Sequence, residues 1–181
     1  MRVLTKKFII PDYVRCQRCP LWQYRRNVVF GRGVVPANLL LIGEAPGTSE
    51  DLLGEAFVGP SGRLLNALLK RARELAEIRR LSMFITNVLA CRPCDFKGGP
   101  NRQPQPEEIM HCTPRLLETI SRVSPKRTVL LGQVARKVCS PMALGATVID
   151  HPAYILRLGG EGCPAFIRAA RLLSEEMSLC E

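Results

Sequence analysis

The apolar positions of the chain fall into two patterns. Short apolar runs predict four strands, at residues 39–42, 83–88, 129–131 and 146–149. Apolar residues at helical spacing predict helices between and after the strands, at residues 61–76, 107–121, 133–138 and 163–179. Because strands alternate with helices, we expect an α/β fold with three layers, α/β/α, around a central four-stranded, mainly parallel sheet.

The length of the chain sets the number of domains. Its 181 residues, 46% of them hydrophobic, are enough for one α/β domain with a buried core and too few for two of ordinary size. We therefore expect a single domain over residues 1–181. No apolar run approaches the roughly 20 residues that span a bilayer, and the N-terminus lacks the features of a signal peptide. A cytoplasmic protein without membrane contact is expected.

The charge of the chain is strongly positive. Lysine and arginine number 26 against 16 aspartates and glutamates, a formal net charge of +10. Such a surplus on a compact domain attracts polyanions, so nucleic acid is the first partner to consider. A uniformly solvated basic surface would have the same composition, and the motifs must decide between the two.

Three polar residues stand at the ends of predicted strands. Glu44 follows the first strand, Asn87 ends the second and His151 follows the fourth. In a parallel sheet, functional side chains gather at the carboxyl ends of the strands, so these three are expected to converge on one crevice. A turn amide and a loop-capping histidine are the structural alternatives for Asn87 and His151.

The eight cysteines of the chain favour metal binding over disulfides, because the cytosol keeps thiols reduced. Cys16 and Cys19 are separated by two residues, and Cys91 and Cys112 lie on either side of a proline-rich loop. Such a set can hold one metal centre. The spacing leaves zinc and a four-iron cluster equally open, and Cys94 competes with the two later cysteines as a ligand.

Six groups of short motifs follow one another along the chain: Gly43-Glu44-Ala45-Pro46-Gly47, Glu50-Asp51, Phe57-Val58-Gly59 with Gly62, Thr86-Asn87-Val88 with Cys91-Arg92-Pro93, Asn101-Arg102 with Pro104, and His151-Pro152 with Leu156-Arg157. In this order they resemble the motifs of the family 4 uracil-DNA glycosylases, the iron–sulfur branch of the uracil-DNA glycosylase superfamily. The resemblance implies a three-layer α/β/α fold and a [4Fe-4S] cluster. It also implies an enzyme that hydrolyses the N-glycosidic bond of deoxyuridine in DNA, releasing uracil and leaving an abasic site.

The resemblance also assigns roles to individual residues. Phe57 would stack on a flipped uracil, and Asn87 would read its edge, accepting from N3–H and donating to O4. His151 would donate to O2 as negative charge develops there. Glu44 would position the attacking water and oppose the positive charge on the sugar. The cluster ligands would be Cys16, Cys19, Cys91 and Cys112.

The remaining assignments concern the pocket wall and the DNA. Gly43 and Ala45 would line the base pocket, and Glu50 would stand against C5 and exclude the methyl group of thymine. Backbone amides near a helix start would approach phosphates, and a loop would enter the minor groove. The phosphate contacts are expected at Gly47, Gly59, Ser61 and Gly62, and the minor-groove loop at Leu156 and Arg157. The partner would be single- or double-stranded uracil-containing DNA, bound by a monomer.

The chain departs from the family pattern in two places: Cys94 replaces a second proline, and residues 95–100 form an insertion. It differs from the better-known uracil-DNA glycosylases at Ala45, where those enzymes have an aspartate. A related branch carries on an inserted loop a histidine that bonds covalently to the abasic sugar, but no histidine lies between Cys91 and Asn101. We therefore expect turnover.

Two other functions fit the same sequence. One is a superfamily member that acts on or binds another modified or deaminated base. The other is a non-catalytic iron–sulfur or zinc protein that binds DNA.

Overall fold

The computed structural model describes residues 8–142 and 145–180 of the chain. Its sheet has five strands in the order β1-β3-β2-β4-β5. Their bounds are β1 (Arg32–Gly33), β2 (Leu39–Gly43), β3 (Met83–Asn87), β4 (Arg127–Leu131) and β5 (Thr147–Ile149). Strands β2 to β5 pair in parallel and include all four predicted strands.

The number of strands corrects the prediction of four. The additional strand, β1, pairs antiparallel with β3 at the edge of the sheet, with Arg32 opposite Ile85. It has two residues and no apolar alternation, so its pairing depends on backbone hydrogen bonds that leave no pattern in the sequence. The mainly parallel α/β sheet is confirmed.

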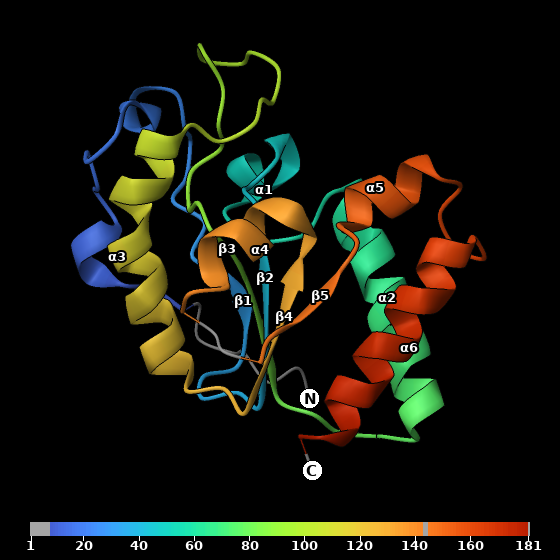
Figure 1. The fold of residues 1–181 in the computed structure, drawn as a ribbon. Coiled ribbons are helices and arrows are strands. Elements are labelled where there is room, and N and C mark those ends of the chain that lie inside the picture. Colours follow the sequence, from blue (N-terminus) through green and yellow to red (C-terminus); the bar gives the residue numbers. More distant parts are fainter. Residues whose placement is uncertain (1–7, 143–144, 181) are drawn as a thin grey trace, which may run out of the picture.

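Helices cover both faces of the sheet, as predicted (Figure 1). They are α1 (Thr48–Leu53), α2 (Pro60–Ala76), α3 (Pro106–Val123), α4 (Gly132–Cys139), α5 (Pro152–Arg157) and α6 (Pro164–Ser178), preceded by two 3₁₀ turns, η1 (Pro11–Tyr13) and η2 (Pro20–Gln23). The four longer helices, α2, α3, α4 and α6, match the predicted ones. In the part of the chain that the structure describes, no helix is long and apolar enough to cross a bilayer.

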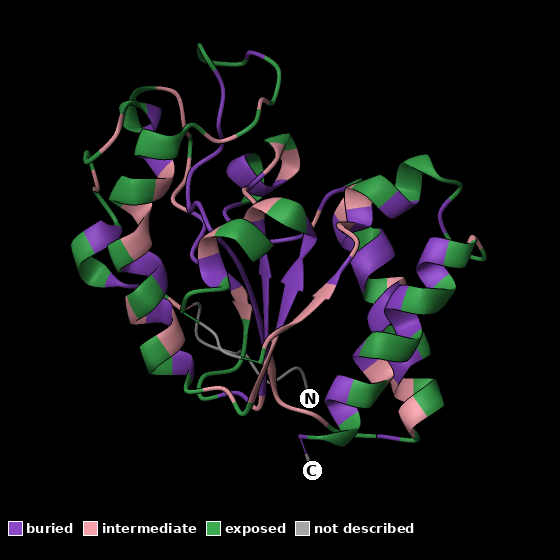
Figure 2. Cartoon of the chain, in the orientation of Figure 1, coloured by how far each residue is buried: buried purple, intermediate pink, exposed green. Residues whose placement is uncertain are grey.

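The central strand β2 shows why the fold has three layers. Leu39 and Leu41 point to the face covered by α2, α5 and α6 and belong to its core. Leu40 and Ile42 point to the other face and pack with α3 and α4. All four side chains are fully buried, which Figure 2 shows as the buried centre of the molecule between exposed helix surfaces. Burial on both faces accounts for the unbroken apolar run of the strand.

Two short helices, α1 and α5, were not predicted, and both follow the carboxyl end of a strand. Each has only six residues, too few to show a helical period in the sequence. Helix α5 corrects the predicted loop at Leu156 and Arg157, because both residues lie in its last turn. The two helices bring additional side chains to the edge of the sheet where Glu44, Asn87 and His151 are found.

Candidate active site

The three polar residues at the strand ends share one cavity. Glu44, Asn87 and His151 line a space of about 390 Å³, together with Phe57 and Ser61. Parallel β2 and β3 place Gly43 and Asn87 side by side in register, and His151 follows β5 at the same edge of the sheet. The predicted convergence of these residues is confirmed.

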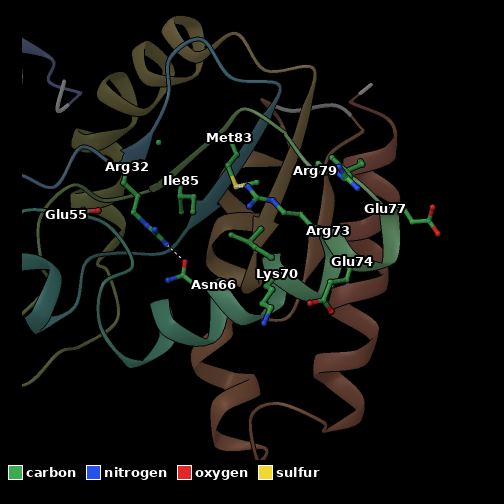
Figure 3. Close-up of a pocket in the computed structure, with 13 residues that line it drawn as sticks. Arg32, Glu55, Asn66, Lys70, Arg73, Glu74, Glu77, Arg79, Met83 and Ile85 are labelled. Carbon is green, nitrogen blue, oxygen red and sulfur yellow. Dashed lines mark hydrogen bonds between the residues drawn. The ribbon is translucent and has the colours of Figure 1, made fainter. Parts of the chain in front are cut away.

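A larger cavity, of about 830 Å³, lies elsewhere, between β1 and α2 (Figure 3). Its charged lining includes Arg32, which donates a hydrogen bond to Asn66, and the nearby Lys70 and Arg73. It reaches β3 at Met83, the first residue of that strand, and contains none of the residues predicted for the site. The candidate active site is therefore the smaller cavity, at the carboxyl ends of the strands.

Asn87 has a buried hydrogen-bond acceptor without a partner. Its side chain is 2% exposed, and among the described residues none donates to its Oδ1. Arg115 holds the main chain of this residue, since its guanidinium donates to the Asn87 carbonyl at 2.7 Å. An unpaired buried acceptor costs about 1–3 kcal/mol, so the cavity favours a ligand that brings an N–H or O–H donor to this oxygen.

Phe57 reaches the cavity through a strained backbone. Its φ of 55° lies in the left-handed region, where a non-glycine residue costs roughly 1–2 kcal/mol. Gly62 makes this conformation possible, because a Cβ on Gly62 would lie 1.9 Å from the Phe57 carbonyl oxygen. Gly62 itself is buried, and the DNA contact expected at this residue stays a prediction. The ring of Phe57 lies 6.2 Å from that of His151, centroid to centroid, at 34°.

His151 is held as a neutral hydrogen-bond donor. It is the N-cap of α5, and its Nδ1 accepts from the Ala153 amide at 3.1 Å. The proton of the neutral ring therefore belongs on Nε2. Burial, with a smaller effect of the Arg157 charge, lowers the pKa of His151 to about 4. At neutral pH the imidazole can donate from Nε2 without carrying a positive charge.

Glu44 presents a carboxylate to the cavity. The residue is half-buried, and burial raises its pKa. No hydrogen bond connects its carboxylate to another residue in the described part of the chain, whereas its main-chain carbonyl accepts from Leu89. Its neighbour Ala45 also lines the cavity. A carboxylate in such a cavity can hold a water molecule or oppose a positive charge.

Glu50 connects two backbone turns beside the cavity. Its Oε1 accepts from the amides of Val58 and Gly59, at 2.9 and 2.8 Å, and its Oε2 accepts from the Gly47 amide at 3.1 Å. The N–H groups of Gly47 and Gly59 therefore already bind a carboxylate, and the phosphate contacts expected at these two residues stay a prediction. Ser61 lies at the start of α2 and lines the cavity, so it remains available for the predicted phosphate contact.

Helix α5 contributes side chains to the rim of the cavity. Arg157 lines the cavity, whereas Leu156 is 43% exposed and lies outside it. Tyr154 and Gln103 also line it and were not predicted. Gln103 follows the Asn101-Arg102 motif directly, a position that could have drawn attention to it. Tyr154 could have been found only if α5 had been recognised, because it stands one turn after His151.

The four predicted cysteine ligands lie together. Cys16, Cys19, Cys91 and Cys112 line one small cavity between the N-terminal segment and α3. Cys94 does not line it; this residue is fully buried, with its Sγ 3.9 Å from the Arg92 carbonyl oxygen. The tertiary structure therefore favours the predicted set over one that contains Cys94.

The surroundings of these sulfurs suit an anionic metal–thiolate centre. Arg25 donates to the Cys91 Sγ at 3.5 Å, and Arg115 lies 3.7 Å from the Cys112 Sγ. Arg115 is only 1% exposed and forms no ion pair with a described carboxylate, so a negative centre would compensate its charge. Two other observations run against a thiolate site for a single metal ion. Burial raises the pKa of the Cys91 thiol to about 12, although the Arg25 charge acts in the opposite direction. Among the described residues, no three His, Cys, Asp or Glu side chains are close enough to hold one metal ion.

Comparison with known proteins identifies the family. Residues 30–173, most of the chain, match the model of the Uracil DNA glycosylase superfamily. The chain belongs to this superfamily. The match extends from the strand before β2 into α6 and so contains every element that lines the candidate active site.

Within the superfamily, the chain is similar to type-4 uracil-DNA glycosylases, which confirms the resemblance found in the motifs. It is 41% identical to the enzyme of Saccharolobus solfataricus over 126 residues, which are 69% of this chain and 55% of that one. It is 42% identical to the Pyrobaculum aerophilum enzyme over 122 residues, 67% and 58% of the two chains. With the Thermotoga maritima enzyme it shares 36% identity over 160 residues, 79% of both. The chain thus spans little more than half the length of the first two relatives.

Proposed function

We propose that this superfamily member hydrolyses the N-glycosidic bond of deoxyuridine in DNA, releasing uracil and leaving an abasic site. The observation that carries the proposal is the unpaired Oδ1 of Asn87, buried in a cavity beside an aromatic ring. Three relatives named type-4 uracil-DNA glycosylases support it. We further propose that residues 1–181 act as one domain and as a monomer.

Recognition of the base follows from the valence of the Asn87 amide. Its Oδ1 accepts from uracil N3–H, and its Nδ2 donates to O4. Cytosine presents the opposite pattern, an acceptor at N3 and a donor at C4. The Asn87 Oδ1 would then face another acceptor, and its Nδ2 would face another donor. The ring of Phe57 stacks on the base once it has been flipped out of the helix.

Cleavage requires stabilisation of two charges. As the C1′–N1 bond breaks, negative charge moves onto uracil O2, where Nε2–H of His151 donates a hydrogen bond. Positive charge develops on the sugar and is opposed by the Glu44 carboxylate, which also positions a water molecule. The water oxygen bonds to C1′ as the C1′–N1 bond breaks. The proton that this water loses ends on the released uracil. Since His151 is neutral, it stabilises the anion through the Nε2–H hydrogen bond alone and carries no positive charge.

The cysteine site would hold a [4Fe-4S] cluster through Cys16, Cys19, Cys91 and Cys112, as the family resemblance implies. Such a cluster would tie the N-terminal segment to β3 and α3. The two arginines directed at the sulfurs, Arg25 and Arg115, fit a negatively charged group. Zinc would use the same thiolates, and the iron content and visible absorption of the purified protein distinguish the two.

The DNA would cross the edge of the sheet where the cavity opens. Ser61 at the start of α2 and Arg157 in α5 would meet phosphates, and the exposed Leu156 would enter the minor groove. The net charge of +10 predicts that binding weakens steeply as salt increases.

The proposal is tested by incubating the iron-loaded protein with a labelled single-stranded oligonucleotide that contains one uracil, followed by alkaline cleavage. Wild type should cleave at the uracil, and Asn87→Ala should not. Asn66→Ala is the matched control, since this amide lies in the other cavity. Cleavage by Asn87→Ala at the wild-type rate would contradict the role of this residue. An inactive but folded wild type would reject uracil as the substrate and point to another base, such as hypoxanthine or xanthine.

A further inference from the structure

The loop before α3 carries an exposed aromatic ring beside the candidate active site. It projects past the strand ends at the same end of the molecule as α1 and α5 (Figure 1). Phe96 in this loop is 59% exposed. The loop starts and ends at the catalytic cavity, because Pro93, Asn101 and Arg102 all line that cavity. An exposed ring so placed is available to a substrate that extends beyond the base pocket.

The base of this loop is held firmly. Arg92, 5% exposed, donates to the carbonyl of Gly99 and to Asn101 Oδ1. Arg102 pairs with the Glu108 carboxylate through two hydrogen bonds of 2.9 and 2.6 Å, and its amide donates to the Pro93 carbonyl. These contacts join the two ends of the loop, so they hold in place the backbone that carries Phe96.

The Phe96 ring packs on its own loop at one point. A Cβ on Gly99 would lie 3.1 Å from the ring, so the ring rests on a backbone that has no side chain. The rest of the ring is open to solvent. Exposing a large apolar ring has a cost in free energy, which a stacking partner would remove.

Another cavity, of about 400 Å³, lies between this loop and α1. Lys97, Arg26 and Tyr24 contribute to its lining, and Asn101 lines both this cavity and the catalytic one. Within the described residues, neither Lys97 nor Arg26 forms an ion pair. The buried Asp51 also contributes, but its Oδ1 already accepts from the amides of Arg26 and Asn27. The cavity thus offers two free cations next to the base pocket.

We propose that this loop and cavity bind the nucleotide adjacent to the flipped uracil on the same DNA strand. The proposal rests on the proposed function. Phe96 stacks on the neighbouring base, as aromatic side chains do with single-stranded nucleic acids of any sequence. Lys97 and Arg26 bind the phosphate that connects the two nucleotides. The uracil strand is the occupant because the two cavities adjoin at Asn101, which lines both.

The test compares three single-stranded oligonucleotides that contain one uracil. One has normal bases throughout, and the other two have a stable abasic analogue immediately 5′ or 3′ of the uracil. For wild type, one of the two replacements should lower kcat/KM roughly 10-fold, the size expected for the loss of one stacked base. Phe96→Ala should show that loss already with normal bases and no further loss with the abasic analogue. Phe96→Tyr should behave as wild type.

Ile167→Ala is the control for the truncation of an exposed apolar side chain, because Ile167 is 45% exposed on α6.

Lys97→Gln should make the slope of log kcat/KM against log salt concentration shallower, by about the amount that one phosphate contact contributes. Equal kcat/KM for Phe96→Ala and wild type with normal bases would overturn the proposal. So would a loss in Phe96→Ala that is the same on all three oligonucleotides. Wild-type activity on the normal oligonucleotide tests the proposed function by itself, so the two failures are distinguishable.

Discussion

Gly43 and Asn87 lie opposite each other in register on adjacent parallel strands, and the missing side chain of one makes room for the amide of the other. A Cβ on Gly43 would lie 2.5 Å from Asn87 Oδ1 and 2.5 Å from Phe57 Cζ. Gly43 lies in a regular strand and needs no special backbone conformation. Its requirement is steric: it holds open the space between the base-reading amide and the stacking ring.

Substitution of Gly43 by Ala should therefore abolish uracil excision. The added methyl group must displace Phe57 or the Asn87 amide from the base pocket, and we expect kcat/KM to fall at least 100-fold, as for other losses of active-site geometry. Circular dichroism and thermal unfolding establish whether the variant folds. A folded Gly43→Ala protein with wild-type kcat/KM would show that the pocket does not use this space.

His151→Asn separates the capping role of this residue from its catalytic role. Asparagine is a good N-cap and can accept from the Ala153 amide, so the melting temperature should change little. The Nε2–H donor is lost, and we expect the single-turnover rate of excision to fall roughly 100- to 1000-fold. Single-turnover rates are measured at saturating enzyme. An unchanged rate would remove His151 from the chemistry, whereas a collapse in melting temperature would show that the imidazole is needed for folding.

The pKa of His151 makes stability depend on pH. Folding lowers this pKa from 6.5 to about 4, so between these values the unfolded chain binds more protons than the folded one. Stability should therefore fall as the pH decreases from about 6.5 to about 4, and this part of the loss should be absent in His151→Asn. Thermal unfolding of both proteins at pH 7 and pH 4.5 gives the comparison. Equal losses in the two proteins would contradict the buried, neutral histidine.

Glu50→Gln tests the carboxylate that joins the two turns. One of its three amide contacts would become a donor facing a donor, and charge-assisted bonds would become neutral ones. We expect the free energy of unfolding to fall by about 1–3 kcal/mol. We also expect a lower kcat/KM, because Phe57 directly precedes Val58 and Gly59, whose amides Glu50 binds. Glu108→Gln is no suitable control because it breaks an ion pair. Glu175→Gln is suitable, because Glu175 is exposed on α6 and forms no ion pair with another described residue. Unchanged stability would show that the turns hold without this residue.

Iron content tests the cysteine assignment. Cys112→Ala should lose iron and the visible absorption of a cluster, together with several degrees of melting temperature, because the N-terminal segment would no longer be tied to α3. Cys94→Ala should keep both, since this thiol lies outside the cavity of the other four. Iron loss in Cys94→Ala with retention in Cys112→Ala would reverse the assignment.

Much of the fold could be predicted because the longer elements have periodic apolar patterns. The run from Leu39 to Ile42 predicts a strand buried on both faces, and the structure buries both faces. The positions of Glu44, Asn87 and His151 after strands predict their convergence, which the cavity confirms. The sequence did not predict the elements that are too short to show a period, namely the two-residue β1 and the six-residue α1 and α5. Because α5 was not predicted, the contribution of Tyr154 to the cavity was not predicted either.

The glycines show what the sequence alone leaves open. A glycine near a helix start is compatible with phosphate binding, with a tight turn or with close packing, and only the neighbours in space distinguish these roles. The Gly47 and Gly59 amides bind the Glu50 carboxylate, and Gly62 lies against the Phe57 carbonyl. These contacts join residues whose spacing has no pattern that identifies the partner.

The α/β class, the order of the main elements, the family motifs, and the candidate ligands and polar site residues could all be predicted from the sequence. These properties depend on local periodicity and on residue type, and both are present in the sequence. The tertiary structure alone decided that Cys94 lies outside the cysteine cavity, that His151 carries its proton on Nε2 and that the Asn87 oxygen is unpaired. Each of these depends on distances between atoms far apart in the chain or on burial, and only the packed fold sets those.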